Sequence, residues 1–163
     1  MVERRGRYGD WEADTIIGKG QKQAIVSLTE RRARLTLLVK VQTREAKTVG
    51  QAMTRLLWPV ANRVHTITAD NGKEFAEHET IAEDLEANFY FAHPYASWER
   101  VLNENTNGLV QQYFPNHCHF GRITDEEIQT VIDKLNNRPR KCLGFKTPNE
   151  VFFGIKPIVA LAS

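Results

Sequence analysis

The sequence of 163 residues lacks any apolar run that approaches the roughly 20 residues needed to span a bilayer. It also lacks a secretory signal, because no apolar segment follows the positively charged start at residues 1–7. It has only two cysteines, Cys118 and Cys142, which cannot form a disulfide framework. We therefore expect a cytoplasmic protein with reduced thiols and no membrane partner.

The sequence also lacks an excess of one charge sign, because its net charge is only +2. That value alone does not indicate a nucleic-acid partner. The distribution of charge along the chain is more informative, because segregated charges can give one basic and one acidic surface even when the totals nearly cancel. Six acids and no Lys or Arg lie within residues 74–86, whereas the basic residues form three clusters: Arg4, Arg5 and Arg7; Arg31, Arg32 and Arg34; and Arg138, Arg140 and Lys141. The alternative is that each basic cluster only solvates a turn.

The hydrophobic pattern predicts one α/β domain. Short turns separate the first three strands and favour an antiparallel meander, while a helix between two later strands favours a parallel crossover. The predicted strands are residues 11–17, 24–29, 35–41, 64–69 and 88–93. The first predicted helix runs from the N-cap Thr43 to Pro59, and the others cover residues 75–87, 97–113, 124–136 and 147–154. The order is βββ-α-β-α-β-α-α-α around a mixed sheet.

The predicted helix at residues 97–113 has one acid on an otherwise uncharged polar face. Its N-cap is Ser97, and an apolar stripe is expected at Trp98, Val101, Leu102, Leu109 and Tyr113. On the opposite face, steps of three and four residues align Arg100, Glu104, Asn107 and Gln111. Glu104 should therefore project from a helix that directly follows the fifth strand.

Three acids lie where this layout allows them to meet. Asp14 is within the first strand, Asp70 is at the carboxyl end of the fourth, and Glu104 is on the helix after the fifth. Ligands bind at the carboxyl ends of strands in open α/β sheets, and converging carboxylates need a cation to neutralise them. Oxygen ligands of this kind favour Mg²⁺ or Mn²⁺. The spacing leaves Glu12, Glu74 and Glu99 as alternative ligands.

Several separate motifs resemble the DDE transposases and retroviral-type integrases, and most closely the bacterial insertion-sequence transposases of the IS-thirty type. The 33 residues from 71 to 103 between Asp70 and Glu104 match the gap in that family's triad. The motifs are residues 9–14 (GDWEAD), 68–75 (TADNGKEF), 94–100 (PYASWER), 103–109 (NENTNGL), 136–140 (NNRPR) and 146–152 (KTPNEVF). The resemblance implies a ribonuclease-H-like catalytic core at residues 9–154, with a flexible lead-in at 1–8 and a tail at 155–163.

The resemblance implies a Mg-dependent enzyme that cuts and joins DNA. Asp14, Asp70 and Glu104 would be catalytic and would hold Mg²⁺, which Mn²⁺ can replace, with two ions when DNA is bound. The partners would be double-stranded transposon ends and target DNA, and the chain would form a homodimer or higher oligomer in a bacterial cytoplasm, nucleoid-associated when bound to DNA. The predicted DNA-binding residues are Lys73, Arg100, Asn107 and Gln111.

This sequence departs from the family pattern at a few places. Val101 stands where the family continues with glycine after Trp-Glu-Arg, and residues 116–119 (NHCH) differ from the expected loop. The helix-turn-helix region with which such transposases read their ends is expected to be missing from this chain. A zinc site at residues 117–119 is disfavoured, because adjacent residues lack the usual ligand spacing. Two alternatives stay open: a ribonuclease-H-like nuclease without strand transfer, and a decayed DNA-binding or dimerisation module.

Overall fold

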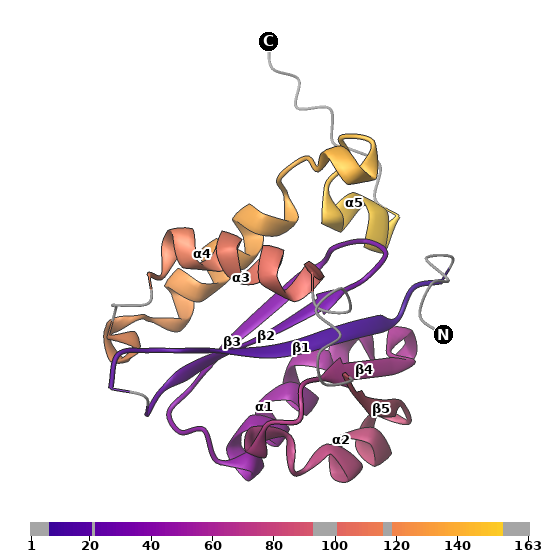
Figure 1. Cartoon of the computed structure of the whole chain (residues 1–163). Helices are drawn as coiled ribbons and strands as arrows, with labels where there is room; N and C mark the ends of the chain where they lie inside the picture. Colours follow the sequence, from indigo (N-terminus) through magenta and orange to yellow (C-terminus); the bar gives the residue numbers. More distant parts are fainter. Residues whose placement is uncertain (1–6, 21, 93–100, 116–118, 155–163) are drawn as a thin grey trace.

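A computed structural model of the chain describes residues 7–20, 22–92, 101–115 and 119–154. Its centre is one five-stranded sheet with the strand order β3-β2-β1-β4-β5 (Figure 1). The strands are β1 (Asp10–Ile17), β2 (Ala24–Glu30), β3 (Thr36–Val41), β4 (Thr66–Ala69) and β5 (Asn88–Phe91). β1 to β3 pair antiparallel, and β4 and β5 add parallel pairs beside β1, which confirms the predicted mixed sheet.

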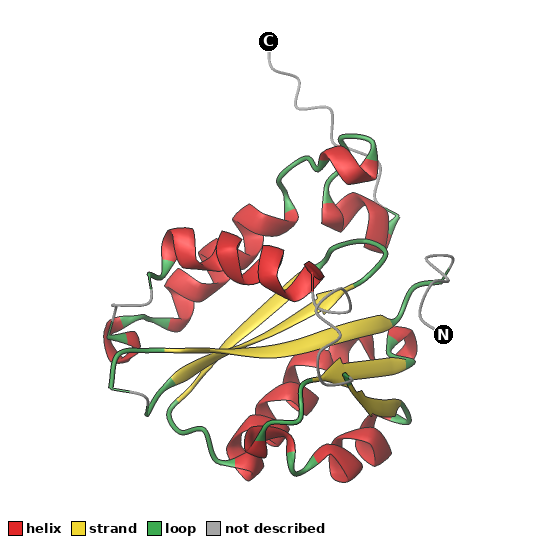
Figure 2. Ribbon diagram, in the orientation of Figure 1, coloured by secondary structure: helices red, strands yellow, loops and turns green. Residues whose placement is uncertain are grey.

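Within these described ranges, five α-helices cover the two faces of the sheet (Figure 2). They are α1 (Ala46–Leu57), α2 (His78–Leu85), α3 (Val101–Tyr113), α4 (Asp125–Asn136) and α5 (Pro148–Phe153). Short 3₁₀ turns stand between them at η1 (Trp58–Arg63), η2 (Lys73–Phe75), η4 (Phe120–Arg122) and η5 (Lys141–Leu143). The element order is the predicted one.

The alternation of side chains along each strand divides the interior into two cores. On what we call the α1–α2 face, Trp11, Ala13 and Ile67 pack with side chains of α1 and α2 and with Phe152 of α5. On the α3–α4 face, Ile16, Ile25 and Leu38 pack against α3 and α4. The division follows from residue parity, because Ala13 and Asp14 are neighbours in β1 and must point to opposite faces.

The threonine N-caps of both predicted capping boxes are present at the helices of the C-terminal third. The hydroxyl oxygen of Thr124 accepts from the backbone N–H of Glu127 at 3.1 Å and so caps α4. The hydroxyl oxygen of Thr147 accepts from the N–H of Glu150 at 3.1 Å, and Pro148 occupies the first turn of α5. These contacts satisfy N–H groups that the helices leave without an internal partner.

Two predicted helix starts differ from the structure. α1 begins at Ala46, so the prediction of Thr43 as N-cap was wrong; its hydroxyl accepts weakly from the N–H of Glu45 at 3.4 Å and donates to Thr48 at 3.2 Å. A threonine that bonds two residues ahead forms a turn that competes with helix. The helix predicted over residues 75–87 is divided into η2 and the shorter α2.

The buried side of α3 is also shifted from the predicted stripe. Thr106, Val110 and Phe114 are buried, whereas Tyr113 is 37% exposed. Buried residues that recur every four positions show that α3 packs through this row against β1 and β2. The predicted cap Ser97 and Trp98 lie outside the described residues.

Within the described residues, none of the helices combines the length and the apolar character that crossing a membrane would require.

Candidate active site

The parallel pairing of β1 with β4 sets two of the predicted acids side by side. The register joins Trp11 to Ile67 and Glu12 to Thr68, so two further residues along each chain bring Asp14 level with Asp70. Both acids have the parity of the α3–α4 face, and both are half-buried. Paired strands lie about 4.8 Å apart, and the last paired residues are Glu12 and Thr68, two residues before Asp14 and Asp70.

The Asp14 carboxylate is oriented by two hydrogen bonds. One oxygen accepts from the backbone N–H of Thr15 at 2.9 Å, and the other accepts from the Asn107 side-chain amide at 2.6 Å. Asn107 comes from α3, so the second bond ties this helix to the sheet at the position of the acid. The two bonds therefore fix the orientation of a carboxylate of the kind that binds Mg²⁺ or Mn²⁺.

Asn107 has a second polar atom in the same place. Its side-chain oxygen Oδ1 is buried and accepts no hydrogen bond from the residues that the structure describes. A buried carbonyl oxygen without a donor is costly. Oxygen atoms of Asp and Asn side chains suit Mg²⁺ or Mn²⁺, so a cation beside Asp14 fits the chemistry of this part of the site.

Glu104 lies on α3 one turn before Asn107, and its side chain is exposed. Residues three apart share a helix face, so Glu104 belongs to the side of α3 that carries Asn107. Across the described ranges, however, no three His, Cys, Asp or Glu side chains are gathered closely enough to hold a metal. Asp14 thus lies in β1 and Asp70 directly after the neighbouring strand β4, whereas Glu104 forms no three-membered cluster with them in this part of the chain.

The alternative acids have other partners. Glu12 is only 3% exposed and forms an ion pair with Arg31, whose Nε lies 3.5 Å from the carboxylate. Glu74 of η2 accepts a hydrogen bond from the Thr15 hydroxyl at 3.0 Å, and Thr15 points to the opposite sheet face from Asp14. Glu99 lies outside the described residues. Glu12 is therefore engaged by Arg31, and Glu74 lies on the opposite face of the sheet from Asp14.

The predicted DNA-binding residues occupy different places around these acids. Lys73 is exposed on η2, three residues after Asp70, and Gln111 is half-buried on α3, one turn after Asn107. Arg100 lies outside the described residues. The bond from Asn107 to Asp14 was not predicted, although the three-residue step from Glu104 to Asn107 already put the amide on the acidic face of the helix.

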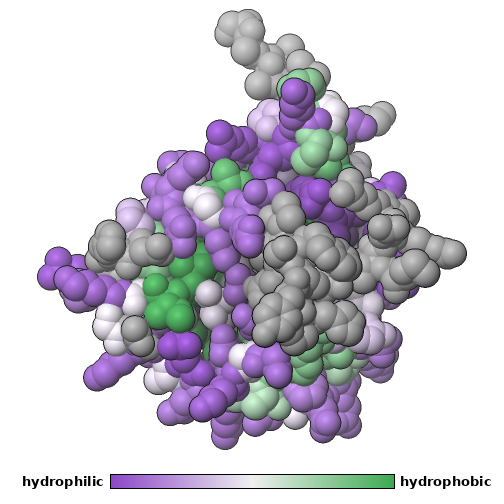
Figure 3. Space-filling view, in the orientation of Figure 1, coloured by the Kyte–Doolittle hydropathy of each residue, from purple (hydrophilic) through white to green (hydrophobic). Residues whose placement is uncertain are grey.

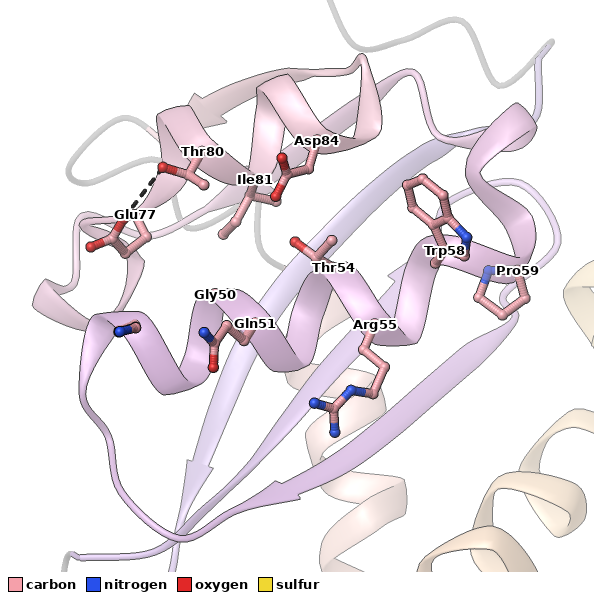
Figure 4. A pocket seen from close by; sticks show the side chains of 11 residues that line it. Gly50, Gln51, Thr54, Arg55, Trp58, Pro59, Glu77, Thr80, Ile81 and Asp84 are labelled. Atoms are coloured by element: carbon pink, nitrogen blue, oxygen red, sulfur yellow. Dashed lines mark hydrogen bonds between the residues drawn. The ribbon is translucent and has the colours of Figure 1, made fainter.

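A groove of about 830 Å³ lies elsewhere, between α1 and α2 (Figure 4). Gly50 allows the two helices to approach, because a Cβ there would stand 3.2 Å from the Cβ of Glu77. Trp58, which is 63% exposed, and Pro59 lie at one end, where α1 passes into η1. The groove is on the α1–α2 face and so lies across the sheet from Asp14.

Comparison with known proteins shows what the chain is similar to. No protein-family model matches it. It is 51% identical over 152 residues, 93% of the chain, to the transposase for insertion sequence element IS4351 of Bacteroides fragilis, of which it covers 47%. It is 36% identical over 151 residues, 92% of the chain, to the transposase InsI for insertion sequence element IS30A of Escherichia coli K12, of which it covers 39%. The chain thus spans less than half the length of these two relatives.

Solved structures agree on the fold. The chain superposes on the catalytic core domain of BIV integrase with a TM-score of 0.68, covering 90% of this chain and 95% of that one at 18% identity. The same strand order and flanking helices confirm the ribonuclease-H-like fold. Over nearly all of its length, the chain is therefore similar in sequence to insertion-sequence transposases, and it has the fold of the retroviral integrase catalytic cores.

Proposed function

We propose that this chain is the catalytic core of a DNA transposase, a metal-dependent enzyme that cleaves DNA strands and transfers them to a target. The observation that carries the proposal is the parallel pairing of β1, which contains Asp14, with β4, which Asp70 directly follows, together with the bond from Asn107 of α3 to Asp14. The similarity to insertion-sequence transposases supports the same reaction class. Cytoplasmic localisation, nucleoid association and assembly into a dimer or higher oligomer stay predictions.

Asp14, Asp70 and Glu104 are the proposed metal ligands and catalytic residues. Mg²⁺, or Mn²⁺ in its place, would supply an activated nucleophile and neutralise charge on the leaving oxygen, with two ions engaged when DNA is bound. Asn107 keeps one oxygen of Asp14 in place, and its own Oδ1 offers a further acceptor on the same side. Glu104 is supplied by the first turn of α3.

The proposed reaction has two phosphoryl transfers. Water attacks a phosphodiester at the transposon end, the P–O3′ bond breaks, and the strand is left with a free 3′-hydroxyl. That hydroxyl then attacks a phosphodiester of double-stranded target DNA, forms a new P–O bond and releases the target's own 3′-hydroxyl. No covalent protein–DNA intermediate is needed, so no Ser, Cys or His nucleophile is assigned.

The four predicted DNA-binding residues remain candidates for contacts close to the scissile bond. Lys73 follows Asn71-Gly72 directly after Asp70, on an exposed turn where a phosphate can approach. Gln111 and Asn107 lie on the side of α3 that carries Glu104. For Asn107 the bond to Asp14 adds a positioning role. Arg100 is proposed from its sequence position alone.

The test is a plasmid-nicking and oligonucleotide-joining assay in Mg²⁺ with three proteins: the wild type, Asp14→Asn and Glu74→Gln. Asp14→Asn should lose more than about 100-fold of both activities, because even outer-shell partners of a metal typically contribute 10- to 100-fold. Glu74→Gln removes a half-buried carboxylate that we do not place in the site, so it should retain activity within a few-fold. Thermal unfolding checks that both variants fold.

Each outcome separates the proposed function from an alternative. Nicking without joining indicates a ribonuclease-H-like nuclease, and DNA binding without any nicking by the wild type indicates a non-catalytic module. Undiminished nicking by a folded Asp14→Asn protein would falsify the assignment of this acid.

A further inference from the structure

The connection between α4 and α5 is a compact, basic loop outside the proposed active site. The backbone N–H of Arg140 donates to the carbonyl of Lys146 at 2.9 Å, and the N–H of Phe145 donates to the carbonyl of Arg140 at 2.8 Å. Between them stand η5 and Gly144, which has a φ of +64°. Phe145 has a φ of +67°, rare for an aromatic residue, and is 70% exposed. The loop thus holds an aromatic side chain in solvent at a conformational cost.

A buried asparagine fixes this loop to the edge of the sheet. The side-chain oxygen of Asn136, the last residue of α4, accepts from the N–H of Thr36 at 2.8 Å, and its amide nitrogen donates to the carbonyl of Thr36 at 2.8 Å. Asn136 is only 3% exposed, and Thr36 opens the edge strand β3. The two bonds bring Arg34, two residues before Thr36, close to Arg138, two residues after Asn136.

The result is a cluster of cations. Burial is the main cause of the lowered pKa of the Arg140 guanidinium, and the positive charges of Arg138 and Arg34 lower it further. Arg140 donates to the carbonyl of Leu135 at 3.2 Å, while its Nε–H is buried and has no acceptor among the residues described. The members of this cation cluster are Arg34, Arg138, Arg140, Lys141 and Lys146. Among the described residues, no acid forms an ion pair with any of them.

The turn that carries Arg34 is also held rigidly. Arg34 has a φ of +63°, and its N–H donates to the carbonyl of Glu30 at 2.9 Å. The buried carboxylate of Glu30 accepts from the N–H of Ala33 at 2.5 Å and from that of Gly9 at 3.2 Å. The cations are therefore presented from fixed backbone on both sides, and like charges held together in this way favour a polyanionic partner.

The cluster begins at the end of α4, the helix that packs on β3 on the same face of the sheet as Asp14. Thr36 pairs with Thr29, and Thr29 with Glu12, so Thr36 stands two strands away and level with a residue two before Asp14. With about 4.8 Å between strands and 3.3 Å per residue, Thr36 is on the order of 12 Å from Asp14. Hydrophilic residues predominate on the surface where α4 and α5 lie (Figure 3).

We propose that Arg34, Arg138, Lys141 and Lys146 form a second DNA-binding surface that contacts the phosphate backbone of a duplex running away from the active site, with Phe145 against a deoxyribose. The proposal rests on the proposed function, because it takes DNA as the polyanion. Phosphates are the anions that clustered Arg and Lys recognise independently of sequence, so this surface positions the duplex and does not read bases.

The test measures fluorescence anisotropy of a labelled 30-base-pair DNA duplex with the 163-residue chain in EDTA, which prevents cleavage, between 50 and 200 mM salt. The double variant Arg138→Gln/Lys146→Gln removes two exposed cations of the cluster. Its slope of log K against log salt should be shallower by about 2, because each lost phosphate contact changes the slope by about 0.9. The matched control Lys47→Gln/Arg55→Gln removes two exposed cations near the α1–α2 groove and should leave the slope unchanged.

Phe145→Ser supplies an independent measurement, because an apolar contact does not release counterions. It should weaken binding without a change in slope. Equal slopes for the two double variants would overturn the proposal, as would a wild type that fails to bind the duplex at 50 mM salt. The proposal would also be overturned if Arg138→Gln/Lys146→Gln weakened the binding of an RNA duplex or an acidic peptide but left the binding of the DNA duplex unchanged. Asp14→Asn should keep the wild-type slope and lose nicking, so failure of this surface and failure of the proposed function give different results.

Discussion

The two faces of the sheet bury different kinds of side chain. The α1–α2 face is closed by apolar residues such as Trp11, Met53 and Phe75, all fully buried. The α3–α4 face buries polar groups as well, among them Ser27, Thr29 and Thr36. Thr29 and Thr106 bond to each other across the interface between β2 and α3 at 3.2 Å. Buried polar groups need partners in defined positions, so this face fixes geometry, while the other mainly supplies stability.

The largest effect on stability should come from the apolar face. Trp11→Ala removes a fully buried ring that contacts Phe152 at a centroid distance of 5.8 Å and should lower the free energy of unfolding by about 3–5 kcal/mol. Trp58→Ala removes the same side chain from a position that is 63% exposed and should cost far less. Urea unfolding of both variants measures the difference. Equal losses would show that the α1–α2 face is not the main source of stability.

The next effect should come from a polar group of the other face. Asn136→Ala leaves the N–H and the carbonyl of Thr36 without their side-chain partners, and we expect a loss of about 2–4 kcal/mol. Asn137→Ala changes its exposed neighbour and serves as the control. Urea unfolding again gives the values. A loss no larger than that of the control would mean that the pairing of Asn136 with the edge strand contributes little.

A smaller effect is expected at the site, and there it should change activity more than stability. Asn107→Ala frees one oxygen of Asp14 and should reduce metal affinity or nicking by roughly 10- to 100-fold, the usual range for groups that orient metal ligands. Because Asn107 acts through Asp14, the loss should be partly recovered at higher Mn²⁺ concentration. Gln112→Ala, on an exposed position of the same helix, is the control. Loss of activity that no Mn²⁺ concentration recovers would contradict a positioning role.

The smallest effects should appear in the pH dependence of stability, with opposite signs on the two faces. Burial raises the pKa of Glu30, on the α1–α2 face, above its ordinary 4.5, although backbone N–H groups oppose the shift. The folded state then binds the proton more tightly, so this carboxyl should add stability as the pH falls from neutral through its raised pKa to 4.5.

Asp10, on the α3–α4 face, behaves in the opposite way. Burial would raise its pKa, but hydrogen bonds from Arg7 and Thr66 and the nearby positive charges lower it below 3.8. The stability that Asp10 contributes is present above pH 3.8 and should be lost as the pH falls through its lowered pKa in the folded state. Unfolding curves of the wild type, Glu30→Gln and Asp10→Asn from pH 7 to 2 check both signs. The same pH trend for the two variants would refute the assignment.

The sequence predicted the parts of the molecule that depend on local pattern. Strand alternation and capping boxes such as Thr124 with Glu127 are set within a few residues, so their prediction succeeded. The bond from Asn107 to Asp14 joins residues 93 apart, and those from Asn136 to Thr36 join residues 100 apart; both depend on how helices dock on the sheet. The parallel pairing of β1 with β4 could be expected from the crossover, but its register could not.

The buried face of α3 shows why the helix at the site was only partly predicted. Of the predicted stripe, Leu109 packs against the core, but Tyr113 is 37% exposed, and the structure buries Thr106 and Val110 instead. Thr106 is polar and finds its partner in Thr29 of another element, which a pattern of hydrophobic residues does not reveal. The rotation of α3 about its axis, and hence the side on which Glu104 projects, is therefore a tertiary property.

The central claim is that Asp14 and Asp70 hold a divalent cation on the α3–α4 face. Crystals of the chain soaked with Mn²⁺ test it directly through the anomalous signal of the metal. The account predicts a peak between the Asp14 and Asp70 carboxylates, on the side of α3, and its disappearance in Asp14→Asn. A peak at Glu12 or Glu74 instead, or no peak at a Mn²⁺ concentration that supports nicking, would contradict it.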